Sequence, residues 1–425
     1  MIKKISLLLM ISILFSMFSG CFDRREIDEL AYVMAVGLDK GKTNALRMTL
    51  QIAIPSAATG GGKENGGGEG GSESSYEITV ETPTIYSGIN IANTFVSRQL
   101  NLSHTKALIF SEELAREGVK PYINAITRNR EFRPDMNVLV SKTSAEKFIR
   151  NVKPRLEANT ARYYELTLAG FNYTGFIANT DFHKFYRQSV AIDQQPVAIL
   201  AAVSSYEGSE DIKLEDSTYK DKGRDLPFEG DFKAGKIPNS GGLKAEVMGL
   251  AVFRGDKMVG ELDGEEAGMY LMATGEYNYS SMTFLDPVTK NNFIVLNVKQ
   301  SRMPQQRIKM EGDNPHIYTK LILEADIMSI QSGINYEKPE NLSKLEEAAE
   351  NSIKEGMLRY LNRTARELNS DICGFGAHLK KNFLTWQDWV KFDWPGRYKD
   401  CKFDVEVDLK IRRPGLMVRT SPPNS

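Results

Sequence analysis

The first clear pattern of apolar and polar positions predicts a β-hairpin near the start of the chain. Residues 31–38 (AYVMAVGL) are almost continuously apolar, as in a strand buried on both faces. Residues 46–54 then alternate with period two, after a turn at residues 39–42. Further strands are expected at 76–82, 106–110 and 137–141, and helical segments at 84–100, 112–128 and 144–150. Strands that alternate with helices predict a mixed α/β N-terminal domain.

The middle of the chain is aromatic and then polar. Residues from about 154 to 195 are expected to be helical, and they contain eight aromatic residues. These rings either pack between domains or face a ligand or partner, and both interpretations stay open. Residues 196–206 predict a strand. Residues 207–241 are polar and are expected to form an inter-domain stretch.

The C-terminal part shows the clearest periodicity. A hairpin is expected at 246–262, with strands at 293–298 and 317–327 and an amphipathic strand at 403–411. A capping box at residues 343–346 (SKLE) predicts the start of a long helix with an apolar residue every four positions, down to about residue 368. This pattern predicts a C-terminal antiparallel sheet covered by long helices. The whole chain is therefore expected to be a multi-domain α+β protein with a helical middle region.

The N-terminus has the pattern of a bacterial lipoprotein signal. Lys3 and Lys4 precede an apolar run of about 14 residues, which is shorter than the roughly 20 needed to cross a bilayer. Two small residues, Ser19 and Gly20, then come directly before Cys21, as in a lipobox. We expect Cys21 to carry a diacylglyceryl group, because two acyl chains anchor a protein stably. The alternative is a plain secretory signal or an uncleaved anchor, with Cys21 incidental.

Composition narrows the class of protein without naming it. At 425 residues and 47.7 kDa the chain is too long for one ordinary core, so several domains are expected. Lys plus Arg number 54 and Asp plus Glu 55, so there is no basic excess of the kind a nucleic-acid binder usually has. A mean hydropathy of −0.35 excludes a polytopic membrane protein. With three cysteines the chain is no disulfide-dense scaffold.

These observations divide the chain into segments. The expected divisions are a signal peptide at 1–20, an N-terminal domain at 21–195 with a glycine-rich loop at 55–75, a middle strand and polar stretch at 196–241, a C-terminal domain at 242–415, and a tail at 416–425. The remaining cysteines, Cys373 and Cys401, would then lie outside the reducing cytosol. They are either bonded to each other or are two free, partly buried thiols.

Signatures of catalysis are missing from the sequence. The four histidines are far apart, so neither a catalytic nor a structural metal site is expected. Residues 37–43 (GLDKGKT) resemble a P-loop but are one residue short and lead into a strand, so we reject a nucleotide site. The acidic pairs Glu265-Glu266 and Glu346-Glu347 are expected on solvated faces. Three tryptophans, within residues 386–394, form either part of the core or an interaction surface.

Five segments together resemble one family. They are similar to segments of the Ger(x)C spore germination lipoproteins. Two of them follow Cys21, at residues 23–30 (DRREIDEL) and 33–39 (VMAVGLD), and three come later, at 249–253 (GLAVF), 371–376 (DICGFG) and 411–415 (IRRPG). Phe22 stands where that family commonly has tryptophan. Cys373 stands where it usually has an aromatic or other apolar residue.

The resemblance implies a non-catalytic role. Members of this family are C subunits of nutrient germinant receptors, anchored by lipid on the outer face of the inner spore membrane. They assemble with two integral-membrane partners, the A- and B-type receptor subunits, and have three α+β domains. It further implies no cofactor apart from the lipid on Cys21, and a membrane-proximal contact through Asp23, Arg24, Arg25 and Glu26.

Two other functions fit an extracytoplasmic lipoprotein. One is an enzyme that acts on cell-wall glycan or peptide, since a pair of catalytic acids assembled in three dimensions leaves no trace in the sequence. The other is a substrate-binding lipoprotein of a transporter.

Overall fold

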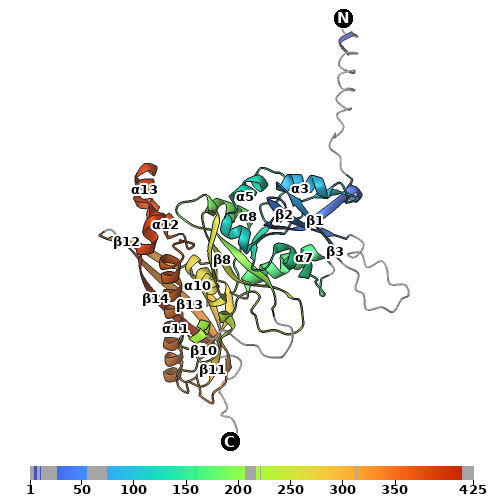
Figure 1. The fold of residues 1–425 in the computed structure, drawn as a ribbon. Coiled ribbons are helices and arrows are strands. Elements are labelled where there is room, and N and C mark those ends of the chain that lie inside the picture. Colours follow the sequence, from blue (N-terminus) through green and yellow to red (C-terminus); the bar gives the residue numbers. More distant parts are fainter. Residues whose placement is uncertain are drawn as a thin grey trace, which may run out of the picture.

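The computed structural model describes residues 4–6, 10, 26–54, 74–157, 159–205, 217–220, 222–312 and 314–413. These residues form two β-sheets with helices packed on them, and the two sheets lie side by side (Figure 1). The expected α+β class with several domains is therefore confirmed.

The first sheet has nine strands and is mixed. Its order is β3-β2-β1-β5-β6-β7-β8-β9, and β4 pairs with the beginning of β1. The central strands β1, β5, β6 and β7 are parallel, while the pairs at both ends are antiparallel. The bounds are β1 (Leu30–Lys40), β2 (Leu46–Ala53), β3 (Ser75–Thr82), β4 (Gln99–Asn101), β5 (Ala107–Ser111), β6 (Asn137–Ser141), β7 (Val197–Val203), β8 (Ala245–Arg254) and β9 (Lys257–Leu262).

Helices cover both faces of this sheet. On β5, Leu108 and Phe110 contact one group of helices, and the alternate residues Ala107 and Ile109 contact the other. This explains why the central strands are continuously apolar. The first group is α3 (Ile85–Ala92), α4 (Glu112–Glu117), α5 (Lys120–Thr127) and α8 (Phe182–Ser189), and the second is α6 (Ala145–Asn151) and α7 (Thr160–Leu168).

Two expectations for this region need correction. The helix expected at 84–100 ends at Ala92, and the short strand β4 follows, because the Asn93 side chain accepts a hydrogen bond from the Leu100 amide at 3.0 Å and closes a turn. The expected hairpin at 246–262 forms, but β8 pairs with β7 and so extends the first sheet. All seven residues of β7 are buried, so this strand requires a neighbour on its outer edge.

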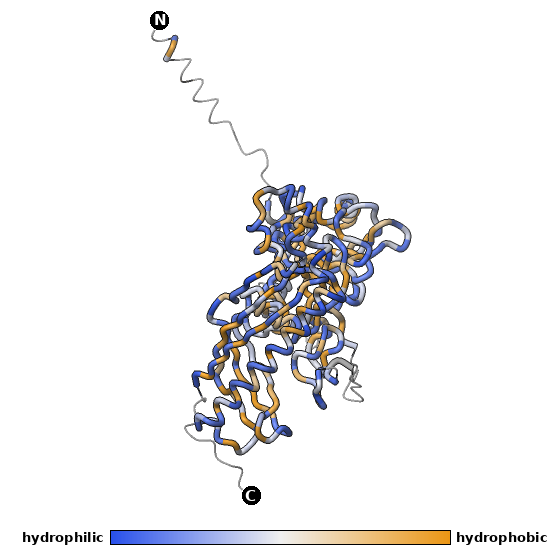
Figure 2. The backbone as a smooth tube through the Cα atoms, turned by 90° about the vertical axis from the view of Figure 1, so that its left-hand side faces the viewer, coloured by the Kyte–Doolittle hydropathy of each residue, from blue (hydrophilic) through white to orange (hydrophobic). Residues whose placement is uncertain are grey.

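The second sheet is built around one long strand. Its members are β10 (Tyr279–Leu285), β11 (Phe293–Gln300), β12 (Gln305–Glu311), β13 (Asn314–Ile330) and β14 (Lys402–Arg413). One edge of β13 pairs with β12 and then β11, and the other pairs with β14. Buried and less buried residues alternate along β13. The extended strands in the lower part of Figure 2 likewise alternate between hydrophobic and hydrophilic positions. The sheet was expected to be antiparallel, but β14 runs parallel to β13 because a helical segment brings the chain back to the same end.

Two helices join the sheets. The helix α11 (Pro339–Arg366) packs on β14 and on α10 (Gly264–Thr274), whose residues are mostly buried. It begins one turn before the predicted capping box, with Pro339 in its first turn, where a missing amide hydrogen is harmless. Short helical segments complete the described chain: η1 (Ile27–Glu29), η2 (Ala169–Asn172), α9 (Ser217–Lys220), η3 (Glu229–Asp231), α12 (Phe375–Leu379), η4 (Lys380–Asn382), α13 (Trp386–Phe392), α14 (Trp394–Arg397) and η5 (Tyr398–Asp400).

The aromatic residues are divided between core and surface. Tyr164, Phe182 and Phe185 are buried against the first sheet, so these three rings pack within one domain and not between two domains as one interpretation held. Trp389 and Trp394 are buried in the second core, whereas the Trp386 side chain is 56% exposed. Of the two interpretations of the tryptophan cluster, the core therefore holds for two residues and the surface for one.

Candidate functional site

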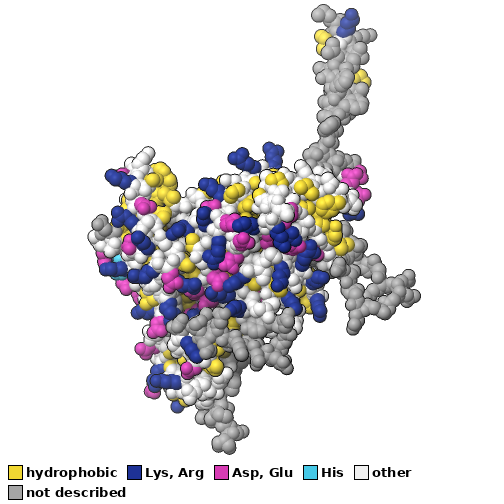
Figure 3. Space-filling view, in the orientation of Figure 1, with side chains coloured by type: hydrophobic (Ala, Val, Ile, Leu, Met, Phe, Trp, Pro, Cys, Tyr) yellow, Lys and Arg dark blue, Asp and Glu magenta, His cyan; other side chains and the backbone are white. Residues whose placement is uncertain are grey.

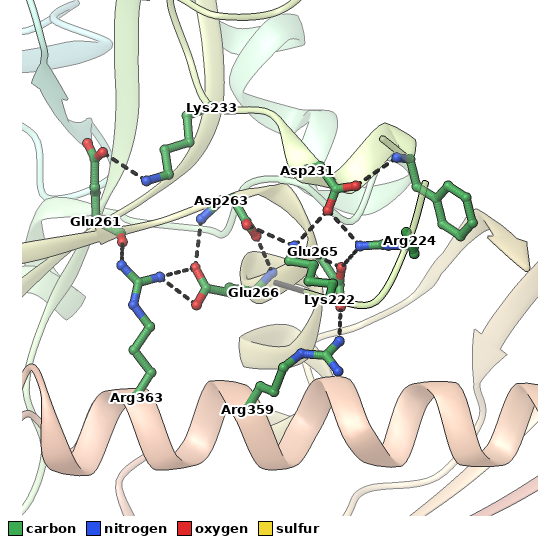
Figure 4. Close-up of polar contacts among 11 residues, drawn as sticks. Lys222, Arg224, Asp231, Lys233, Glu261, Asp263, Glu265, Glu266, Arg359 and Arg363 are labelled. Atoms are coloured by element: carbon green, nitrogen blue, oxygen red, sulfur yellow. Dashed lines mark hydrogen bonds and ion pairs between the residues drawn. The ribbon is translucent and has the colours of Figure 1, made fainter. Parts of the chain in front are cut away.

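The most highly charged buried feature in the described part of the chain is a network of ion pairs where the two sheets meet. We call it the junction; five basic and five acidic side chains form it (Figure 4). They come from the loop before β8, from β9, from α10 and from α11, and are Lys222, Arg224, Asp231, Lys233, Glu261, Asp263, Glu265, Glu266, Arg359 and Arg363.

Lys222 lies at the centre of the junction. Its ammonium group contacts Asp231 at 2.7 Å, Glu265 at 2.9 Å and Asp263 at 3.0 Å. Arg224 reinforces two of these contacts, at 2.6 Å to both Asp231 and Glu265. The polar stretch that the sequence indicated as inter-domain therefore contributes three cations to the junction, because Lys233 also lies in it and contacts Glu261 at 2.9 Å.

The acidic residues at the start of α10 are held by a capping box. The Asp263 carboxylate accepts from the Glu266 amide at 2.9 Å, and the Glu266 carboxylate accepts from the Asp263 amide at 3.0 Å. Glu265, between them on the first turn, faces Lys222. The solvated face predicted for Glu265-Glu266 is therefore wrong, since only 16% and 13% of these side chains is exposed. Of the other acidic pair, Glu346 is also largely buried and accepts from the Ile411 amide at 2.8 Å.

Two arginines from α11 complete the junction. Arg359 contacts Glu265 at 3.0 Å, and Arg363 forms an ion pair with Glu266. The second terminal nitrogen of Arg363 donates to the Glu261 carbonyl oxygen of β9 at 2.9 Å. The four-residue spacing puts both arginines on one face of α11. That face thereby links α10 to the edge strand of the first sheet.

The electrostatics of the junction favour ionised side chains. Burial alone would raise the pKa of Glu265, but Lys222, Arg224 and Arg359 outweigh it and hold that pKa at about 2. Burial, together with the neighbouring charge of Glu266, raises the pKa of Asp263 to about 6. The three carboxylates around Lys222 outweigh its burial and raise its pKa. At neutral pH, Lys222 and Glu265 are therefore charged, and Asp263 is mainly so.

Such a network fixes geometry and offers little reactive chemistry. The junction carboxylates are all engaged by cations or backbone amides, so none of them is available as a general base. A cavity of about 60 Å³ lies beside the junction, bordered by Arg224, Phe228 and Tyr277. That volume has room for a few water molecules. Within the described ranges, no group of three or more His, Cys, Asp or Glu side chains could hold a metal ion.

Most residues predicted to meet the membrane lie outside the described residues. These are Cys21, Asp23, Arg24 and Arg25. Glu26 is described and exposed, immediately before η1 and the first strand of the large sheet. Across the part of the chain that the structure covers, no helix is both long and apolar enough to cross a bilayer.

The two C-terminal cysteines are free thiols, so the disulfide considered from the sequence is absent. Cys373 lies 3.1 Å from the Tyr360 hydroxyl, whereas the Cys401 sulfur faces the Arg397 carbonyl oxygen at 4.0 Å. Both residues are buried, and burial raises the pKa of both thiols. These two cysteines therefore behave as small core residues.

Sequence reasoning missed the role of Asp371. Its carboxylate accepts from the backbone amides of Gly374, Phe375 and Gly376 at 2.8, 3.1 and 2.7 Å. It also accepts from the Trp394 indole nitrogen at 2.9 Å. Burial raises the pKa of Asp371 to about 6, against the effect of these four bonds. The motif at 371–376 is thus a carboxylate-centred turn that holds the last helices on the second sheet.

Fold and junction together define a class of protein: a two-sheet α+β chain whose halves are fixed to each other by buried ion pairs. Comparison with known families then identifies it. The family model described as "Spore germination protein N-terminal domain" matches residues 23–203, and the family model described as "Spore germination B3/GerAC like, C-terminal" matches residues 248–415. The chain belongs to the Ger(x)C family of spore germination proteins.

Individual relatives agree over nearly the full length. The putative spore germination protein YfkR of Bacillus subtilis (strain 168) is 26% identical, over 99% of this chain and 98% of its own. Spore germination protein KC of the same strain is 24% identical, over 98% and 97%. The crystal structure of the GerBC protein aligns with a TM-score of 0.50 and 14% identity, over 88% of this chain and 96% of that one, and shows the same fold. Family membership supports a role in spore germination.

Proposed function

We propose that this chain is a lipid-anchored, non-catalytic subunit of a spore nutrient germinant receptor. The carrying observation is the full-length similarity to spore germination proteins, with a lipobox-like sequence ending at Cys21, two residues before the first family match begins. The subunit would sit on the outer face of the inner spore membrane, held by acyl chains on Cys21. It needs no other cofactor.

Its partners would be the integral-membrane A- and B-type receptor subunits. Asp23, Arg24, Arg25 and Glu26 would lie between the anchor and the first sheet, where they can position the protein against those partners. The junction supports a role in assembly or signalling, because a network of ion pairs lets the two sheets move as one body. A subunit of this kind would hold or pass on an arrangement of the receptor subunits and would catalyse no reaction.

The test is nutrient-triggered release of dipicolinate from spores of the native host. Spores that lack the gene should lose the response to particular nutrients, and the wild-type gene should restore it. Cys21→Ala should restore it poorly and should leave the membrane fraction. Phe18→Leu, which introduces the aliphatic residue usual in a lipobox, is the matched control and should restore the response fully.

A second comparison addresses the contact residues. The double reversal Arg24→Glu with Arg25→Glu should reduce recovery of the chain in receptor complexes extracted from spore membranes, while lipid attachment stays intact. The proposed function also makes a wider prediction, tested in a strain with no other receptor of this type. If spores of that strain without the gene respond unchanged to a broad panel of nutrients, the proposed function is contradicted.

A further inference from the structure

A surface segment shortly before β14, the last strand of the second sheet, exposes apolar side chains that are not packed in the core. Residues 380–391, which we call the tip, span η4 and α13. In the tip, the Leu384 side chain is 99% exposed, Trp386 56% and Val390 50%. Apolar side chains exposed next to one another are typical of interaction surfaces, whereas singly exposed ones are ordinary.

The tip is rigid beneath its exposed side chains. The Phe383 ring packs on Trp389 at 5.3 Å and on Phe392 at 5.0 Å between ring centres, and Trp389 is buried. The Thr385 side chain caps α13 by accepting from the Asp388 amide at 3.1 Å. The segment that carries the exposed side chains is therefore itself packed and capped.

Basic side chains surround the apolar ones. Lys381 and Lys391 are exposed, and the Lys380 ammonium group lies 4.9 Å from the centre of the Trp386 ring while it pairs with Asp193 at 3.0 Å. One acidic residue of the tip, Asp388, accepts from the Thr385 hydroxyl at 2.7 Å. Tryptophan beside lysine is the combination favoured at the boundary between lipid headgroups and acyl chains.

The tip lies on the same side of the molecule as the start of the first strand. Figure 1 shows α13 at the upper left edge and α3, with the beginning of β1 beside it, at the upper right. Next to that beginning, the last turn of α3 exposes Ile91 (41%), and the turn after the helix exposes Phe95 (54%) and is followed by Arg98. In Figure 3, hydrophobic side chains gather at both ends of this upper edge, with Lys and Arg side chains between them.

Chain length ties this edge to the lipid. Leu30 comes nine positions after Cys21, so the start of β1 can be at most ~32 Å from an anchor on Cys21. This length is short enough for the rest of the edge to reach the same membrane surface.

We propose that the tip is a second membrane contact, which inserts Leu384, Trp386 and Val390 into the interfacial layer of an anionic phospholipid surface. Together with the anchor, it would lay the long edge of the protein along the membrane and fix its orientation toward its partners. The choice of this edge rests on the lipid anchor in the proposed function, whereas the insertion itself is tested without it.

The chain supplies its own probe, because its three tryptophans are Trp386, Trp389 and Trp394 and the last two are already buried. The mature chain, residues 21–425 with Cys21→Ala, is mixed with vesicles of phosphatidylglycerol and phosphatidylcholine. We expect a blue shift of tryptophan emission and co-sedimentation, both weaker with phosphatidylcholine alone. Trp386→Phe should abolish the shift while most of the sedimentation remains.

Matched variants distinguish binding by the tip from nonspecific binding by exposed apolar side chains elsewhere. Leu384→Ser with Val390→Ser should lower the partition coefficient at least ~10-fold. The control, Leu285→Ser with Val288→Ser, removes two side chains that are each 43% exposed near the far end of β13, and should bind like the starting chain. Circular dichroism checks that all variants are folded.

Three outcomes would overturn the proposal: no shift and no sedimentation by the starting chain; equal binding by tip and control variants; or tip variants that bind vesicles normally but are lost from receptor complexes. The last result would assign the tip to a protein partner. Because the anchor is absent here, failure of the tip leaves lipid attachment at Cys21 untouched. Loss of lipid attachment in spores would likewise leave a vesicle-binding tip in place.

Discussion

At the scale of single residues, Asp371 shows how one buried carboxylate can organise a whole segment. Four N–H groups, three from the backbone and one from Trp394, converge on it. The next residues lead to α12 and the tip. Gly376 is required beside it, because a Cβ there would lie 2.5 Å from the Trp394 ring. The shape of the segment therefore depends on a carboxylate with no charged partner among its hydrogen bonds.

Asp371→Asn should destabilise the protein. The amide nitrogen of asparagine would point a donor at N–H groups that now donate to an oxygen, which leaves at least one buried donor unsatisfied. We expect the free energy of unfolding to fall by about 2–4 kcal/mol, measured by urea unfolding with tryptophan fluorescence. Asp225→Asn, at an exposed position, should change it by less than about 0.5 kcal/mol. Equal effects at both positions would contradict the role given to Asp371.

Glu265 gives the junction a defined response to acid. Its pKa is held at about 2 in the folded state, below the ordinary value of 4.5. The stabilisation is therefore complete above about pH 4.5 and is lost as the pH falls toward 2, because protonation removes the charge that Lys222 and the two arginines face. Glu265→Gln should be less stable at pH 7 and should flatten this part of the profile.

The measurement is the free energy of unfolding of the two proteins at several pH values between 2 and 7. The raised pKa of Asp263 contributes with the opposite sign: its effect is present below about pH 4 and is lost as the pH rises through 6. The difference between wild type and Glu265→Gln isolates the Glu265 contribution. Parallel profiles between pH 4.5 and 2 would show that the cations do not hold this carboxylate.

At the scale of elements, α11 is the part that connects the junction to the second core. Arg363→Met should leave Glu266 without its cation and remove the arginine donor from the Glu261 carbonyl, and we expect a loss of about 2–3 kcal/mol in unfolding free energy. Arg366→Met is the control on the same helix, since Arg366 is exposed and bonds Asn362 within α11. Chemical unfolding of both variants makes the comparison, and similar losses would refute the special position of Arg363.

The sequence predicted well the elements that either have one exposed face, which gives a regular alternation of apolar and polar residues, or are buried throughout, which gives a continuous apolar run. The strands β1, β2, β13 and β14 and the helix α11 are of this kind. The helix α10 gave no signal because it is buried on nearly all sides, so its apolar residues show no stripe. Its acidic pair Glu265-Glu266 was predicted to be solvated because adjacent acidic residues usually lie on an exposed face.

The junction itself was beyond sequence reasoning. Its residues lie between positions 222 and 363, and their approach depends on how the sheets meet, which no spacing encodes. The one available signal was the capping pattern at Asp263 and Glu266, an acidic N-cap followed three residues later by glutamate. Asp371 was noticed as part of a motif, but a turn built on backbone amides leaves only its glycines as a trace.

At the scale of the whole molecule, the two halves are less separable than a linear division suggests. The hairpin β8–β9 follows the polar stretch, and the C-terminal family match begins inside β8, at residue 248. Yet β8 pairs with β7 over its length, and Glu261 of β9 takes part in the junction. The C-terminal part of the sequence thus supplies two strands of the N-terminal sheet.

A fragment cut at the boundary drawn from the sequence should therefore fail to fold properly. Residues 26–241 would leave β7 as an open edge whose seven residues (VAILAAV) are all apolar, and such an edge pairs with other chains. We expect this fragment to aggregate, and addition of residues 242–262 to raise its soluble yield several-fold, because β8 then covers the edge. Size-exclusion chromatography and circular dichroism compare the two fragments with residues 26–413. A monomeric 26–241 fragment with cooperative unfolding would show that the first sheet does not need the hairpin, and that the halves fold independently before the junction joins them.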